Sequence, residues 1–177
     1  MLIQLPKKTE TIFIVTVFLI LSGMILFNFQ SAKVKSRDQQ RKNDLKRTYS
    51  ALNAYLTEVG KFPSAKDGKM VACNGKPCEW GKDSLVFIDD LGNTRVYQDI
   101  IPQDPLQKDG FSYVYFSDLD QYQILAHLES TDDPEYMPEV AARQIKCGTQ
   151  IANYGVANSG TTLDKSVDEQ AKPKDLP

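Results

Sequence analysis

IFIVTVFLILSGMILFNF, residues 12–29, is an apolar run of eighteen residues without a charged side chain. Its only polar members are Thr16, Ser22 and Asn28. A helix rises 1.5 Å per residue, so this run would reach about 27 Å and could cross the hydrocarbon core of a membrane. A cleaved signal peptide usually has a shorter apolar core, and a buried core helix would need a larger chain around it. We therefore predict a short N-terminal segment, 1–11, and a retained transmembrane helix, 12–29.

A second helical pattern follows the apolar run without a break. Its apolar residues recur at spacings of four and three, which places them on one face of a helix. These residues are Leu45, Tyr49, Leu52, Leu56 and Val59. Gly60 stands where a helix C-cap is expected. The pattern predicts a basic amphipathic helix over 30–60 that continues the span and whose apolar stripe packs on another part of the chain.

Charge is divided sharply along the sequence. Between positions 33 and 47 the sequence has seven basic residues and only two acidic ones, Asp38 and Asp44. The basic residues are Lys33, Lys35, Arg37, Arg41, Lys42, Lys46 and Arg47. From Thr48 onward twelve Lys and Arg stand against twenty Asp and Glu, a net charge of −8. A basic stretch beside a span is typical of a contact with anionic lipid, or of a cytoplasmic stop signal. Charge alone would thus leave the C-terminal part in the cytoplasm.

The part after the helix, 61–156, is predicted to be a small head with a β-hairpin. FSYVYF (111–116) and QYQILAHLE (121–129) alternate around a turn at 117–120. One face of the second strand, formed by Tyr122, Ile124, Ala126 and Leu128, is predicted to cover the helix stripe. Gln121, Gln123, His127 and Glu129 are predicted to point outward. The fold class is therefore α+β, with one long N-terminal helix packed on a small antiparallel sheet.

Two other segments of the head region carry weaker patterns. Residues 84–105 fit a short helix and a strand equally well. Residues 157–177 are polar and lack periodicity, so we expect a disordered tail there.

The order of these parts resembles type IV pilins and the major pseudopilins of type II secretion systems. Residues 36–45, SRDQQRKNDL, are similar to the ARDxQRKxDL run of that family's helix. Residues 55–63 resemble its helix exit, and IPQDP, 101–105, resembles its LPxDP motif. The segments 112–115 and 122–124 resemble its hairpin. The resemblance covers about residues 10–129 and implies a pilin-like fold with an extracytoplasmic head.

The same resemblance assigns a role in assembly to Glu10. In the family, a glutamate at this place is thought to be neutralised inside the membrane by the N-terminal amine of a neighbouring subunit. Here Leu5 stands where the family has a glycine before its cleavage point, and Pro6 stands at the first mature position. In an uncleaved chain the positive group would have to come from Lys7 or Lys8.

The resemblance implies a membrane-anchored structural subunit of a type IV pilus or a type II secretion pseudopilus. Its partners would be the membrane and other pilin-like subunits or the secretion machinery, including copies of itself. It would be a single-pass protein of the inner membrane with its head outside the cytoplasm. The alternative is an anchored extracytoplasmic binding or accessory domain that does not polymerise. Direct contact with nucleic acid is not expected of an acidic head.

The cysteines bear on the compartment. Cys73 and Cys78 flank an Asn-Gly turn, and a disulfide between them would suit an oxidising exterior and stabilise the fold by roughly 2 kcal/mol. Cys147 has no obvious partner. A zinc site from Cys73, Cys78, Cys147 and His127 is the alternative use of these residues, although their spacing is unlike that of common zinc motifs.

Enzymatic chemistry is not predicted. No nucleophile elbow, phosphate loop, HExxH or dinucleotide fingerprint occurs in the sequence, and His127 has no nucleophile beside it. The acidic pairs Asp89-Asp90 and Asp132-Asp133 are interpreted as solvated turns. Calcium is the one cofactor that the resemblance allows, because related pseudopilins bind it through loop oxygens; the sequence identifies no ligands for it.

Overall fold

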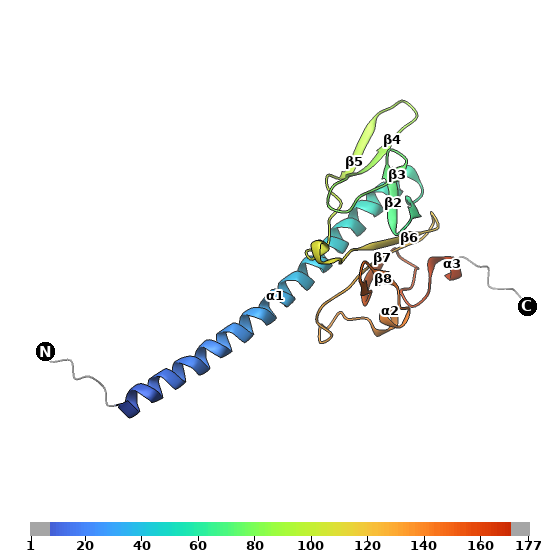
Figure 1. The fold of residues 1–177 in the computed structure, drawn as a ribbon. Helices are drawn as coiled ribbons and strands as arrows, with labels where there is room; N and C mark the ends of the chain where they lie inside the picture. The colour runs from blue at the N-terminus through green and yellow to red at the C-terminus, as the bar shows by residue number, and fades with distance from the viewer. Residues whose placement is uncertain (1–7, 171–177) are drawn as a thin grey trace, which may run out of the picture. The chain divides into compact units, whose positions relative to one another are not determined.

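The structure, a computed structural model, describes residues 8–170 (Figure 1). It consists of two compact units, which meet in the sequence between Arg37 and Asp38. Leu5, Pro6 and Lys7 lie outside the described residues. The helices are α1 (Lys8–Val59), α2 (Pro138–Ala142) and α3 (Val167–Gln170), with a 3-10 turn η1 (Gln107–Asp109). The strands are β1 (Ser64–Lys66), β2 (Lys69–Cys73), β3 (Lys76–Pro77), β4 (Leu85–Ile88), β5 (Thr94–Gln98), β6 (Val114–Ser117), β7 (Tyr122–Ala126), β8 (Lys146–Cys147), β9 (Gln150–Ile151) and β10 (Tyr154–Ala157).

The first unit is the N-terminal part of α1. Most of the large apolar side chains described in it are exposed, on all sides of the helix; they include Ile12, Phe13, Phe18, Leu19, Met24 and Phe29. Among residues 8–170 this is the one helix long and apolar enough to span a membrane. The prediction of a single helix that runs through the span and the basic stretch is confirmed at the level of secondary structure.

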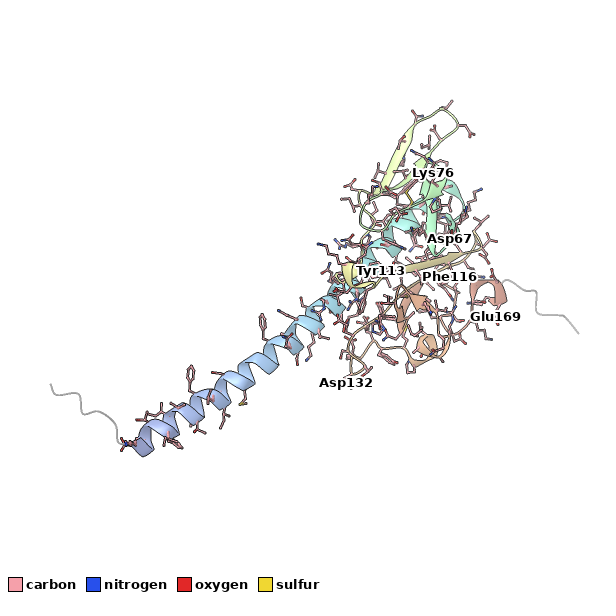
Figure 2. The ribbon with its side chains drawn as sticks, in the orientation of Figure 1. Asp67, Lys76, Tyr113, Phe116, Asp132 and Glu169 are labelled. Carbon is pink, nitrogen blue, oxygen red and sulfur yellow. A yellow bond between two sulfur atoms is a disulfide. The ribbon has the colours of Figure 1, made fainter. Side chains whose placement is uncertain are left out.

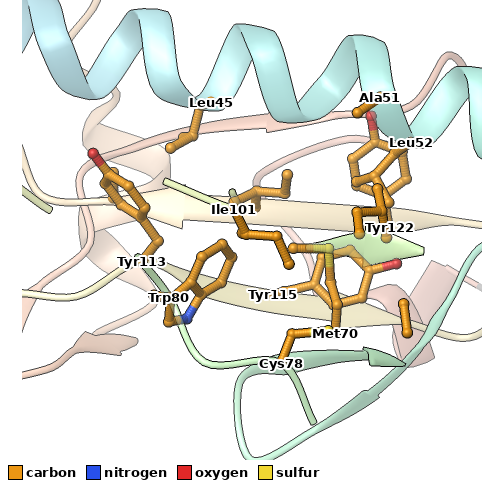
Figure 3. Close-up of a cluster of buried hydrophobic side chains, with 14 of the residues drawn as sticks. Leu45, Ala51, Leu52, Met70, Cys78, Trp80, Ile101, Tyr113, Tyr115 and Tyr122 are labelled. Atoms are coloured by element: carbon orange, nitrogen blue, oxygen red, sulfur yellow. The ribbon is translucent and has the colours of Figure 1, made fainter. Parts of the chain in front are cut away.

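The second unit contains the C-terminal part of α1, whose apolar stripe is buried as predicted. Leu45 and Leu52 are 1% and 0% exposed, and Tyr49, Leu56 and Val59 are partly buried against the same core. Gly60 ends the helix with a positive φ of 77°, and its N–H donates to the carbonyl of Leu56 at 2.8 Å. Figure 3 shows Leu45, Ala51 and Leu52 reaching from the helix toward the aromatic and aliphatic side chains of the head.

The sheet beneath this helix has the strand order β10-β7-β6 and is antiparallel. The predicted hairpin is confirmed as β6 and β7, with Tyr115 opposite Ile124. The face formed by Tyr122, Ile124, Ala126 and Leu128 is fully buried in the core that contains the helix stripe. Phe62 lies edge-on to the Tyr122 ring at a centroid distance of 4.6 Å. The fold is therefore α+β, as expected.

The opposite face of β7 is not solvated, so the prediction that Gln123 and Glu129 point outward is wrong. Gln123 is completely buried, and its amide donates to the carbonyls of Thr162 and Lys165. A second apolar cluster covers this face; it consists of Leu125, Val140, Cys147 and Ala152. Gln121 and His127 are half-buried. Both faces of the sheet are thus buried. The sequence did not indicate this, because the second face carries polar residues.

The C-terminal segment supplies part of this cover, so the expected disorder of 157–177 is wrong for residues 157–170. Ala157 belongs to β10, and Val167, at the start of α3, is 3% exposed. The segment is held largely by polar contacts: Arg143 donates to the Leu163 carbonyl at 2.8 Å, and Gln170 exchanges hydrogen bonds with Thr162. Residues 171–177 lie outside the described part of the chain.

The ambiguous stretch 84–105 forms a β-hairpin, β4 and β5, followed by an irregular segment. Phe87 and Tyr97 pack their rings against Tyr55 of α1, at centroid distances of 6.0 and 5.2 Å. Ile101, after the hairpin, is fully buried in the main core. Aromatic and β-branched side chains fit this hairpin better than a helix.

The buried stripe gives a direct test of this packing. Leu52→Asp should destabilise the head by several kcal/mol, because an ionised carboxylate cannot be buried without a partner between helix and sheet. Limited proteolysis and thermal unfolding of the membrane-extracted protein would measure the loss. Ala54→Asp, on the exposed face of the same helix turn, is the matched control and should behave like the parent. If both variants resist protease equally, the stripe does not carry the head.

Candidate functional site

Glu10 lies in the first turn of α1 and is exposed. A carboxylate at this end of a helix is favoured by the helix dipole. Lys8, two residues earlier, is also exposed and is a cation of the same turn. Glu10 therefore stands at the start of the apolar run, where a neighbouring positive group could reach it.

The predicted disulfide between Cys73 and Cys78 is present. The Asn74-Gly75 turn between them has positive φ at both residues, 53° and 74°, which is the geometry of a tight hairpin turn. Cys78 is 2% exposed and belongs to the main core, so the bridge ties the β2–β3 hairpin to it. Glu10 belongs to the first unit and the disulfide to the second.

Cys147 is a free thiol buried in the second cluster. Burial raises its pKa to about 12, so it is protonated and unreactive at neutral pH. Its place apart from the disulfide means that the structure does not bring together the four residues of the alternative zinc site. Within residues 8–170 no group of three His, Cys, Asp or Glu residues has the geometry of a metal site. His127 instead contacts the Ile151 carbonyl through Nδ1 at 2.7 Å.

The most unusual site in the head is a buried charge cluster around Arg41, which the sequence did not reveal. The Arg41 side chain is fully buried and meets three carboxylates. Nε lies 2.8 Å from Asp104, and Nη1 lies 2.7 Å from both Asp38 and Glu129. The Phe111 ring covers the guanidinium at 5.2 Å. Residues far apart in the sequence thus converge on one cation of the helix.

The carboxylates of this cluster also bind backbone groups. Asp38 accepts hydrogen bonds from the N–H groups of Glu129 and Ser130, at 2.9 and 3.0 Å, just beyond β7. Asp104 accepts one from the N–H of Leu106 at 2.8 Å. Burial acts to lower the pKa of Arg41, but the three carboxylates raise it above its ordinary value, so the cation stays charged. The cluster is a fixed structural joint between α1, the segment after β5 and the end of β7.

Two further ion pairs extend the joint along the helix. Lys42 contacts Asp133 at 3.0 Å and Glu135 at 3.6 Å. Desolvation opposes the charge of Lys42, but its acidic partners raise its pKa overall. The ion pairs of Lys42 therefore stabilise the folded state fully at a pH below the ordinary lysine pKa. This stability is lost as the pH rises through the higher pKa that Lys42 has in the folded state.

Asp44 of the helix is a second buried acid with polar partners. Tyr113, labelled in Figure 2, donates a hydrogen bond to it at 2.9 Å, and Arg47 forms an ion pair with the same carboxylate.

The structure therefore shows that several basic residues of the stretch 33–47 form ion pairs within the protein. Arg41, Lys42, Lys46 and Arg47 pair with acids of the head or of the helix itself. Sequence reasoning missed this because Asp104 and Glu129 are separated from Arg41 by 63 and 88 positions. The one local signal was the spacing of three between Asp38 and Arg41, which places both on one helix face.

A second surface feature of the head is the β4–β5 hairpin, which exposes apolar side chains. Ile88, Leu91 and Val96 are 42%, 86% and 49% exposed, and Ile100 follows at 59%. The other side of the hairpin is fixed on the helix, because Glu58 accepts hydrogen bonds from Arg95 and Tyr97. The hairpin is thus held in place while part of its apolar surface faces outward.

No protein-family model, curated protein or solved structure matches this chain.

The cluster predicts a strong and selective effect of one substitution. Arg41→Met should destabilise the head by about 3–5 kcal/mol, because three carboxylates would lose their shared buried cation. Lys46→Met is the control: Lys46 is 58% exposed and lies 3.9 Å from Glu135, so its loss should cost less than about 1 kcal/mol. Denaturant unfolding of both full-length variants in detergent would compare them. Equal midpoints would show that the cluster does not hold the head.

Proposed function

We propose that this protein is a membrane-anchored, pilin-like structural subunit of a type IV pilus or a type II secretion pseudopilus. The observation that carries the proposal is one helix, α1, that carries an apolar run over residues 12–29 in the first unit and packs in the core of an α+β head in the second. Such a helix suits a subunit whose span bundles with those of its neighbours while its head forms an outer coat.

The surfaces of the chain agree with an assembly role better than with catalysis. The exposed apolar side chains described in the first unit, which include Ile12, Phe18 and Phe29, need lipid or neighbouring helices around them. The head offers the apolar hairpin face of Ile88, Leu91 and Val96 for contact with neighbouring heads. The buried acids serve the joint with α1, so they are not available as a general acid and base.

An anchored head that does not polymerise is the second candidate. Leu5 and Pro6 favour it, because the family's processing site has a glycine where Leu5 stands. Mass spectrometry of the membrane-extracted protein would read the intact N-terminus and its methylation. A processed and methylated start would support the subunit role, and an unprocessed one would favour the anchored head.

Substitution of Glu10 separates the two functions. In an assembling subunit Glu10→Ala should reduce recruitment of copies severalfold, because a positive group of the neighbour loses its partner at the membrane boundary. Glu10→Lys should be worse, since like charges would gather. Co-purification of tagged and untagged copies from cross-linked membranes would measure recruitment.

The head should fold normally in both Glu10 variants, because Glu10 belongs to the first unit. Protease resistance of the head is therefore the internal control. Equal recovery of partner copies for the parent, Glu10→Ala and Glu10→Lys would exclude the assembly role and leave the anchored head as the better account.

The proposed topology places the head outside the cytoplasm, where the Cys73–Cys78 disulfide is stable. A membrane-impermeant maleimide should label whole cells only after mild reduction, because the buried thiol of Cys147 is protected. The double variant Cys73→Ser/Cys78→Ser, which keeps Cys147, should stay unlabelled. Labelling of the parent that requires cell lysis would place the head in the cytoplasm.

A further inference from the structure

Two lysines of the basic stretch are not used by the ion pairs that hold the head. Lys33 and Lys35 are exposed, and among residues 8–170 no acidic side chain forms an ion pair with either of them. They belong to the first unit, together with the apolar run. The contrast with Arg41 and Lys42, whose charges are satisfied inside the head, leaves these two as cations that need another partner.

Their distance from the end of the apolar run places Lys33 within the headgroup layer of a membrane and Lys35 at its outer edge. The run ends at Phe29, so Lys33 and Lys35 follow it by about 6 and 9 Å along the helix. The polar layer on each side of the hydrocarbon core is about 5–8 Å thick. The Lys33 ammonium lies 4.4 Å from the centre of the Phe29 ring, and Phe29 is itself 55% exposed. This arrangement keeps an apolar ring at the core boundary and a cation just beyond it.

We propose that Lys33 and Lys35 each bind the phosphate of an anionic phospholipid. At 100° per residue they are separated by about 200° around the helix, so they reach lipids on opposite sides of it. A lysine near an anionic surface favours binding by about 1 kcal/mol, which is about fivefold. The proposal requires only that the apolar run spans a membrane, so it is independent of the role in a pilus or pseudopilus.

The test uses the full-length protein in phosphatidylcholine vesicles that contain a trace of spin-labelled lipid. Electron paramagnetic resonance measures the fraction of label immobilised at the protein surface. The parent should immobilise labelled phosphatidylglycerol severalfold more strongly than labelled phosphatidylcholine. The variant Lys33→Gln/Lys35→Gln should lose this preference, and each single variant should lose part of it.

The matched control is Lys61→Gln/Lys66→Gln, which removes the same charge from exposed lysines of the head. It should keep the preference of the parent. An unchanged preference in Lys33→Gln/Lys35→Gln, or an equal loss in the control, would overturn the proposal. Inorganic phosphate and sodium chloride at equal ionic strength should weaken the preference equally; a stronger effect of phosphate would indicate a site for a soluble anion instead.

Discussion

The buried guanidinium of Arg41 is the interaction on which the arrangement of the head depends. A desolvated cation is costly unless several acceptors surround it, and here the acceptors come from the helix, from Asp104 after β5 and from Glu129 after β7. These segments must therefore meet at one point of α1. Asp38 strengthens the requirement, because it also binds the backbone N–H groups that follow β7.

The two parts of α1 differ in how their apolar side chains are distributed around the helix. Over residues 12–29 its side chains are largely apolar around the whole circumference, as a hydrocarbon environment would require. In the second unit only one stripe is apolar, and Leu45 and Leu52 bury it against the sheet. Lys33 and Lys35 lie between the apolar run and the buried part of the helix, and both are exposed. The sequence of the helix thus changes along its length from an apolar run to a single apolar stripe.

Features set by local sequence were predictable, and features set by distant partners were not. The stripe, the β6–β7 hairpin and the Cys73–Cys78 bridge depend on periodicity or on a short turn, which can be recognised in the sequence. Gln123 was misassigned because a polar residue on an alternating strand normally faces water. Its partners are carbonyls of the C-terminal segment, and such contacts leave no apolar pattern. The acids around Arg41 were missed for the same reason.

The charge cluster also explains how an apolar stripe can specify a single register. Leu45, Leu52 and Leu56 are similar enough that a sheet displaced by one helical turn would still bury aliphatic side chains. Arg41 removes that freedom, because only one register places its guanidinium between Asp104 and Glu129. In any other register at least one buried carboxylate would lose its cation, at a cost of several kcal/mol. A polar joint therefore fixes the height of the head along α1, which purely apolar packing would leave less defined.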